Sequence, residues 1–279
     1  MTAQTVLTVA ALTLREVARR RVLRALAALT ATLLGLSAWG FSRIDAEFGG
    51  LTTGEALMAS TIVLNLVMFG LSLIAALGTA FLAGPTLAGE IESGIALAVL
   101  ARPVRRAAVL LGKWLGLVIF GSGFVMLAGL AQLIIVRLTT GYWPPQPVTG
   151  LALLAAQTTA LLTLGLLLST AISPMASGII AVGLFGAAWV AGVVGGVGSA
   201  LGNDSVARIG TVSRMILPTD GLWRGAMHAF QDPVLLSPQL VGHPLVSEAA
   251  PTAVYLAWAA LWVAMVLGLA AIGFQRRDL

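Results

Sequence analysis

Six apolar stretches dominate this sequence and leave it few folds to adopt. They cover residues 25–42, 58–82, 114–136, 151–172, 176–197 and 254–274. A bilayer core is about 30 Å thick, and a helix needs about 20 apolar residues to cross it. Lipid offers the backbone no hydrogen-bond partners, so a chain of this kind crosses as helices. The sequence therefore predicts an all-α, polytopic membrane protein with six transmembrane helices in one domain, residues 25–279.

The composition excludes an ordinary soluble protein. Hydrophobic residues make up 58% of the chain and charged residues only 10%, against about 25% charged in a typical soluble domain. The sequence pI is near 11.0, but the basic residues cluster beside apolar stretches, which indicates membrane orientation rather than nucleic-acid binding. With no cysteine and two histidines, we expect no disulfide and no metal site.

Several classes of membrane function lack their usual residues. No predicted span holds a charged residue or a histidine, whereas ion-coupled transporters need such groups near the midplane. No GxxxxGK[ST] loop is present to bind nucleotide phosphates, and no intramembrane protease motif occurs. We therefore expect no enzymatic site and no bound cofactor. The polar residues Asn65, Gln132 and Gln157 either line a pathway or, the more common use, join helices by hydrogen bonds.

The charges orient the predicted spans. Six spans put both termini on one side, which would be the side of segment 89–113. That side then holds eleven Lys and Arg residues and the other side five. Because positive loops stay in the cytoplasm, we expect both termini to be cytoplasmic.

The first 24 residues resemble neither a signal peptide nor a span. Leu14, Val17, Ala18 and Val22 share one arc of a helical wheel. Most of the charged residues lie outside that arc, including Arg15, Arg19 and Arg20, although Arg21 interrupts the pattern. This pattern predicts either an interfacial helix on anionic lipid or a positive flank to the first span.

Segment 89–113 is a charged island between two long apolar stretches. Two carboxylates come first, followed by a glycine, a short apolar piece at 95–100, and then Arg102-Pro103, where a new helix can begin. A loop that only sets topology does not need the two carboxylates or the apolar piece. The order of residues therefore favours a docking element, with a plain topogenic loop as the alternative.

The polar insert at residues 199–251 is long for a connection, and such loops usually carry structure or function. Residues 204–215 and 221–230 predict two short amphipathic helices separated by Pro218. The insert is either a cap over the outer helix ends, an exit gate, or a docking site for an external partner. Pro218, Asp220, Trp223 and Arg224 are its candidate residues.

The order of residues in segment 89–113, which ends with Gly-Lys, resembles the cytoplasmic loop between transmembrane helices 2 and 3 of ABC-2 type transporter permeases. The Pro218-Thr-Asp220 element and Trp223-Arg224 resemble the subgroup that serves nitrous oxide reductase maturation. The chain has Ile95 where the family usually has threonine. The resemblance covers nearly the whole chain, and its initial helix corresponds to the family's elbow helix.

The resemblance implies a permease subunit of an ABC transporter, with export as the direction, in a bacterial or archaeal cytoplasmic membrane. Two permease halves, identical or related, would pair with two ATP-binding subunits, which bind ATP and Mg²⁺. The island would be the coupling helix with its flanks. Contact with the ATP-binding subunit is thereby assigned to Glu90, Glu92, Gly94, Ile95, Leu97, Leu100, Arg102, Pro103, Arg105, Arg106 and Lys113.

A second function class stays open. A membrane scaffold or sensor that transports nothing would use the insert to bind a partner and the charged island to relay a signal. An ATPase that binds this chain would favour transport, and its absence would favour the scaffold.

Overall fold

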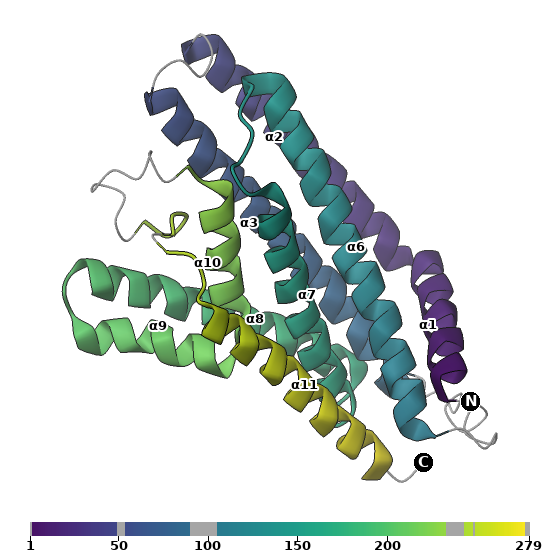
Figure 1. Cartoon of the computed structure of the whole chain (residues 1–279). Helices are drawn as coiled ribbons and strands as arrows, with labels where there is room; N and C mark the ends of the chain where they lie inside the picture. The colour runs from purple at the N-terminus through teal and green to yellow at the C-terminus, as the bar shows by residue number, and fades with distance from the viewer. Residues whose placement is uncertain (1, 49–53, 90–104, 233–242, 248, 277–279) are drawn as a thin grey trace.

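The computed structural model describes residues 2–48, 54–89, 105–232, 243–247 and 249–276. Every regular element in these ranges is a helix (Figure 1). Among the described residues, six helices are long and apolar enough to cross a membrane. The prediction of an all-α chain with six helices long and apolar enough to cross a membrane is therefore confirmed.

The helices follow in a simple order. Their bounds are α1 Thr2–Arg19, α2 Arg21–Phe48, α3 Gly54–Gly84 with a π-helical turn η1 at Pro85–Gly89, α6 Arg106–Thr140, α7 Pro147–Ser169, α8 Pro174–Ala200, α9 Asp204–Ile216, α10 Thr219–Phe230 and α11 Ala253–Arg276.

Local chemistry explains several of these boundaries. Pro147 and Pro174 are the first residues of α7 and α8, where the missing backbone N–H costs nothing and the fixed φ suits a helix. Gly141 ends α6 with a φ of 72°, which glycine adopts readily. The helices extend past most predicted spans, because hydropathy marks only their apolar part. In particular, α2 continues to Phe48, whereas the predicted span ends at residue 42.

Two helices form the centre of the bundle. In the apolar windows of α3 and α7, 61% and 67% of the residues are buried, against 17% in α2 and 22% in α11. The outer helices instead expose large apolar side chains, such as Leu36 and Trp39 on α2 and Leu261 and Leu269 on α11. This is the distribution expected when the outer faces contact lipid.

Helix α1 packs alongside the first third of α6. A Cβ on Gly112 would lie 2.6 Å from the Val9 Cβ, and one on Gly116 would lie 2.9 Å from the Thr13 Cβ. The buried residues of α1 are Ala10, Thr13 and Val17. Of the expected apolar arc, Val17 is buried, whereas Ala18 is exposed. In Figure 1, α1 and α2 follow one another along α6 and are separated by a bend at Arg20.

The insert contains the two helices that the sequence predicts. Helix α9 folds back antiparallel on α8, since Gly210 faces Gly195 and Ala207 faces Gly198. Helix α10 is almost wholly buried and packs against α7, α8 and α3. It is therefore part of the bundle.

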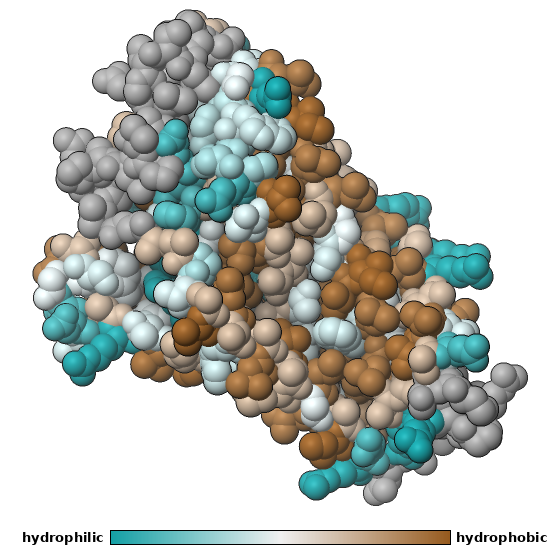
Figure 2. Space-filling view, in the orientation of Figure 1, coloured by the Kyte–Doolittle hydropathy of each residue, from teal (hydrophilic) through white to brown (hydrophobic). Residues whose placement is uncertain are grey.

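The two ends of the molecule are more hydrophilic than its middle. Figure 2 shows brown apolar side chains over much of the visible face, with teal hydrophilic residues toward its ends and edges. Both termini lie at the same end in Figure 1. Arg106, the first residue of α6, reaches that end too, since its Nη1 donates to the Gln275 carbonyl at 3.3 Å.

Candidate functional site

The junction of α8, α9 and α10 is built around one buried carboxylate. Arg214 Nε and Arg224 Nε each donate to Asp220 Oδ2 at 3.0 Å. The Asp220 side chain is fully buried, whereas those of Arg214 and Arg224 are 31% and 14% exposed. Asp220 lies in the first turn of α10 and Arg214 in the last turn of α9, so both also suit the helix dipoles. The cluster carries a net charge of +1.

Glycines on α8 make this junction possible. A Cβ on Gly192 would lie 2.2 Å from the Asp220 carboxyl group, and one on Gly195 would lie 2.6 Å from the Gly210 Cα. Real Cβ atoms do not approach that closely. Helix α8 therefore touches both arms of the α9–α10 hairpin through backbone, as small residues allow at helix interfaces.

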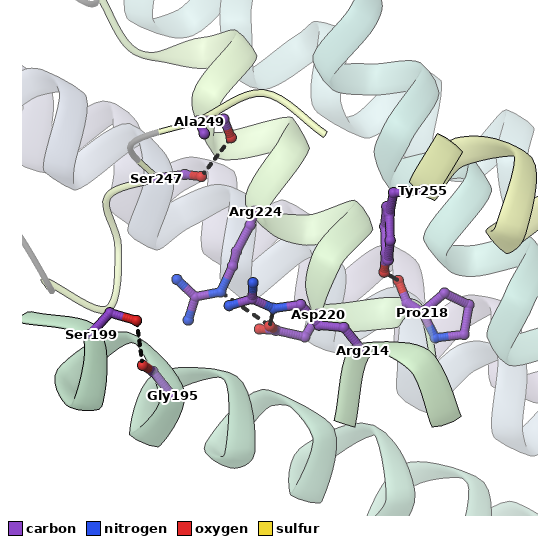
Figure 3. A network of polar contacts seen from close by, with 9 residues as sticks. All are labelled: Gly195, Ser199, Arg214, Pro218, Asp220, Arg224, Ser247, Ala249 and Tyr255. Carbon is purple, nitrogen blue, oxygen red and sulfur yellow. Dashed lines mark hydrogen bonds and ion pairs between the residues drawn. The ribbon is translucent and has the colours of Figure 1, made fainter. Parts of the chain in front are cut away.

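Helix α11 supplies three side-chain donors, two to the end of α9 and one to the turn between α9 and α10. Tyr255 Oη donates to the Pro218 carbonyl at 3.0 Å (Figure 3). Trp258 Nε1 donates to Met215 O at 3.2 Å, and Trp262 Nε1 donates to Ile216 O at 2.8 Å. The last carbonyls of a helix have no partner within the helix. One face of α11 thus caps α9 and fixes the turn at Pro218.

The other end of α10 is held by the loop between α6 and α7. Tyr142 Oη donates to the Phe230 carbonyl at 2.7 Å, and the Gln146 N–H donates to Ala229 O at 3.2 Å. Burial raises the pKa of Tyr142 to about 12, a rise to which Asp232 adds and which a hydrogen bond with Thr61 partly offsets. Both ends of α10 are therefore fastened to transmembrane helices or their loops.

A cavity of about 290 Å³ opens beside the Asp220 cluster. Its wall includes Arg214 and Arg224, the end of α8 at Gly196 and Ser199, and the start of α11 at Tyr255. Ligand sites in proteins begin at about 300 Å³ and combine apolar walls with a few placed polar groups. Figure 3 shows the two guanidinium groups side by side next to the Asp220 carboxylate, and both arginines line this cavity.

The structure brings together three of the four residues expected at the outer site. Pro218, Asp220 and Arg224 belong to one network. Trp223 is buried on α10 and its ring centroid lies 5.5 Å from that of Phe69 on α3. The sequence analysis missed Arg214 and Tyr255. The spacing Tyr255, Trp258, Trp262 on one helical face was the available signal for the α11 contacts.

At the opposite end, only part of the charged island is described. Lys113 is buried in α6, and its Nζ donates to the Thr86 carbonyl in η1 at 2.7 Å. Arg105 is exposed and Arg106 is half-buried. The remaining expected contact residues lie outside the described residues: Glu90, Glu92, Gly94, Ile95, Leu97, Leu100, Arg102 and Pro103.

The basic residues near the N-terminus lie on two helices. Arg15 and Arg19 are exposed on α1, and Arg20, at the bend, pairs with Glu16. Arg21 is exposed at the start of α2. These four arginines place positive charge close to the junction of α1 and α2.

The three polar residues of the predicted spans all make contacts within the protein. Gln132 Nε2 donates to Ser37 Oγ at 2.6 Å, and Gln157 Oε1 accepts from Ser72 Oγ at 2.9 Å. Asn65 Nδ2 donates to the Leu245 carbonyl at 2.8 Å. These bonds join α2 to α6, α3 to α7, and α3 to the insert, which favours the helix-joining interpretation.

Comparison with known proteins does not assign this chain to a family. No family model matches it, and no curated protein matches it significantly.

Proposed function

We propose that this chain is the transmembrane subunit of an ATP-driven ABC transporter, and that an exporter forms when it pairs with a second permease half. A separate ATP-binding subunit would dock on segment 89–113 and supply the energy. The proposal rests on the residue order of that segment, by family analogy, and on how its flanks are held.

The bond between Lys113 and Thr86 is the observation that carries the proposal. It joins η1, which directly follows α3, to the beginning of α6, and the two residues are 27 positions apart in the chain. A cation at the C-terminal end of a helix is also favourable for the helix dipole. A partner that pushed on the island would therefore displace two transmembrane helices together rather than a loose loop.

The length of α6 supports a docking position outside the bilayer. Its 35 residues correspond to about 52 Å, whereas the hydrocarbon core is about 30 Å thick. The turns from Arg106 to Lys113 can thus project beyond the hydrocarbon on the side of the termini. Arg105 and Arg106 would make charge-assisted contacts with the ATP-binding subunit there, together with Glu90 and Glu92.

The test is co-purification with ATP-binding proteins from the native membrane. The test variant combines Glu90→Arg, Glu92→Arg, Arg105→Glu and Arg106→Glu. The control reverses two exposed charges on α9, Asp204→Arg and Arg208→Glu. We expect an ATPase to accompany the wild type and the control and to be lost from the test variant.

Each other outcome has a definite meaning. An ATPase that stays with the test variant would show that these charges are not the docking site. If no ATPase accompanies any form, even with nucleotide present, the scaffold or sensor function replaces transport.

A further inference from the structure

The outer cavity has a positive wall that internal pairing does not neutralise. Asp220 Oδ2 accepts only the Nε–H of each arginine. Within the described part of the chain, the terminal nitrogens of Arg214 and Arg224 donate no hydrogen bond. Two guanidinium groups at one cavity wall present up to eight N–H donors, in the fork geometry that suits carboxylate and phosphate oxygens.

The position of the cavity indicates which kind of anion can reach it. It lies between the last turn of α8 and the first turn of α11, and both helices are long and apolar enough to span the membrane. The ends of such helices lie near the level of the lipid headgroups, just outside the hydrocarbon core. Val197, Leu201 and Val254 expose apolar side chains next to these turns, where acyl chains can lie.

The cavity is kept open by a glycine. Gly196 lines it, and a Cβ there would lie 3.7 Å from the terminal nitrogens of Arg224, an ordinary contact distance. A larger side chain at residue 196 would therefore fill the space without breaking the Asp220 cluster.

We propose that this cavity binds a phosphate-class oxyanion between Arg214 and Arg224, and that its occupant is the phosphate of a membrane phospholipid. The two guanidinium groups supply the charge-assisted hydrogen bonds, and the net charge of +1 balances one phosphodiester. The assignment does not depend on an ATP-binding partner. It needs only the cavity and its arginines.

The experiment uses the purified full-length chain, stripped of lipid in detergent, and needs no ATPase. Native mass spectrometry measures retention of phosphatidylglycerol, with diacylglycerol as the matched lipid that lacks phosphate. The test variants are Arg214→Gln, which removes one donor group, and Gly196→Leu, which fills the cavity. Arg208→Gln is the control, because Arg208 is exposed on α9 and does not line this cavity.

We expect the wild type and Arg208→Gln to retain one phosphatidylglycerol, and neither to retain diacylglycerol. Arg214→Gln should bind phosphatidylglycerol about tenfold more weakly, the loss expected when a charge-assisted hydrogen bond disappears. Gly196→Leu should also bind it more weakly, because its side chain occupies the cavity. Asp220→Asn should bind phosphatidylglycerol more tightly than the wild type does. The substitution replaces the carboxylate, which competes with the lipid phosphate for both arginines, with a neutral amide. A residue with a merely structural role would not produce that gain.

A parallel arm distinguishes a lipid phosphate from a free one. Calorimetry of the lipid-free chain with inorganic phosphate should detect little binding. Binding of inorganic phosphate with the same dependence on Arg214 and Gly196, without retention of lipid, would keep the oxyanion site and reassign its occupant.

Unchanged binding in Arg214→Gln and Gly196→Leu, with both variants as stable as the wild type to heating, overturns the proposal. If Arg214→Gln loses binding because it is unfolded, the result for Gly196→Leu decides, since that variant keeps every charged group. Equal retention of diacylglycerol and phosphatidylglycerol also overturns it, since the acyl chains would then be the group bound.

Discussion

Asp220 links three helices of this chain, α8, α9 and α10. Its carboxylate contacts α8 at Gly192 and pairs with one arginine on α9 and one on α10. Burying a carboxylate without partners is unfavourable by several kcal/mol, and breaking a buried pair costs about 3–5 kcal/mol. The two arginines therefore make this burial tolerable, and the absence of a side chain at residue 192 makes it possible.

The close approach at Gly192 predicts a difference between two otherwise similar substitutions on α8. Gly192→Ala would place a Cβ 2.2 Å from the Asp220 carboxyl group, and such overpacking costs about 1–3 kcal/mol. Gly183→Ala has no neighbour within 4 Å and should stabilise the helix by about 0.5–1 kcal/mol. Thermal unfolding in detergent should lower the midpoint for the first variant only. Equal midpoints would mean that α8 and α10 are not in contact.

Tyr142 predicts a loss of stability at alkaline pH. Burial raises its pKa in the folded state to about 12, against about 10 when unfolded. The folded state therefore binds more protons between these values. Stability is fully present below pH about 10 and falls by on the order of 2–3 kcal/mol as the pH rises to about 12.

The chain has only two tyrosines, so Tyr255→Phe leaves Tyr142 as the single tyrosinate absorption signal. We expect that signal to titrate near pH 12 while the protein is folded. Titration near pH 10 in the folded protein would contradict the burial of Tyr142. In Tyr142→Phe, the alkaline loss of stability should shrink.

At the scale of elements, the contact between α1 and α6 is a feature that the sequence analysis did not predict. A helix on a lipid surface turns its apolar arc toward lipid. Here the arc is centred on Ala10, Thr13 and Val17 and is covered by α6, where Gly112 and Gly116 leave room for it. Leu7 and Leu12 remain exposed on the other side.

This packing can be tested by disulfide formation, because the natural chain has no cysteine. Thr13→Cys with Gly116→Cys would place two Cβ atoms about 2.9 Å apart, and a small relaxation gives the usual 3.5–4.5 Å of a disulfide. Leu12→Cys with Gly116→Cys is the control, because Leu12 is 59% exposed. Oxidation should link the first pair only. Failure of both pairs would show that α1 lies away from α6.

At the scale of the whole molecule, the distribution of charge predicts the orientation in the membrane. The side that holds the termini would carry eleven of the sixteen Lys and Arg residues, as the positive-inside rule requires of the cytoplasmic side. The insert and its cavity would then face outward. With this orientation, the proposed docking segment would face the cytoplasm and the proposed lipid site the other side of the membrane.

Single cysteines can establish this orientation in intact cells. We expect Asn203→Cys, at an exposed position before α9, to react with a maleimide that does not cross membranes. Gln4→Cys and Gln275→Cys, near the two ends of the chain, should react only after the membrane is opened. Labelling of these two positions from opposite sides would rule out six spans.

The pattern of apolar and polar residues predicted all six spans and both insert helices. The length of a span follows from the thickness of the bilayer, and an amphipathic helix follows from residues within one or two turns of each other. The Asp220–Arg224 pair also has a local signal, a spacing of four residues on one helix. Arg214 has no such signal, since Pro218 separates its helix from that of Asp220. Lys113 could be predicted as a charge beside a span, but its bond to Thr86 could not.

The sequence by itself determined that this chain has six segments long and apolar enough to cross a membrane, because about 20 apolar residues in a helix match the thickness of the bilayer core. It also determined, through its charges, the side on which the termini are expected. Only the tertiary structure decided which glycines face another backbone, that α10 is buried in the bundle, and that two arginines border a cavity. Those features depend on contacts between residues far apart in the chain, and local periodicity does not record them.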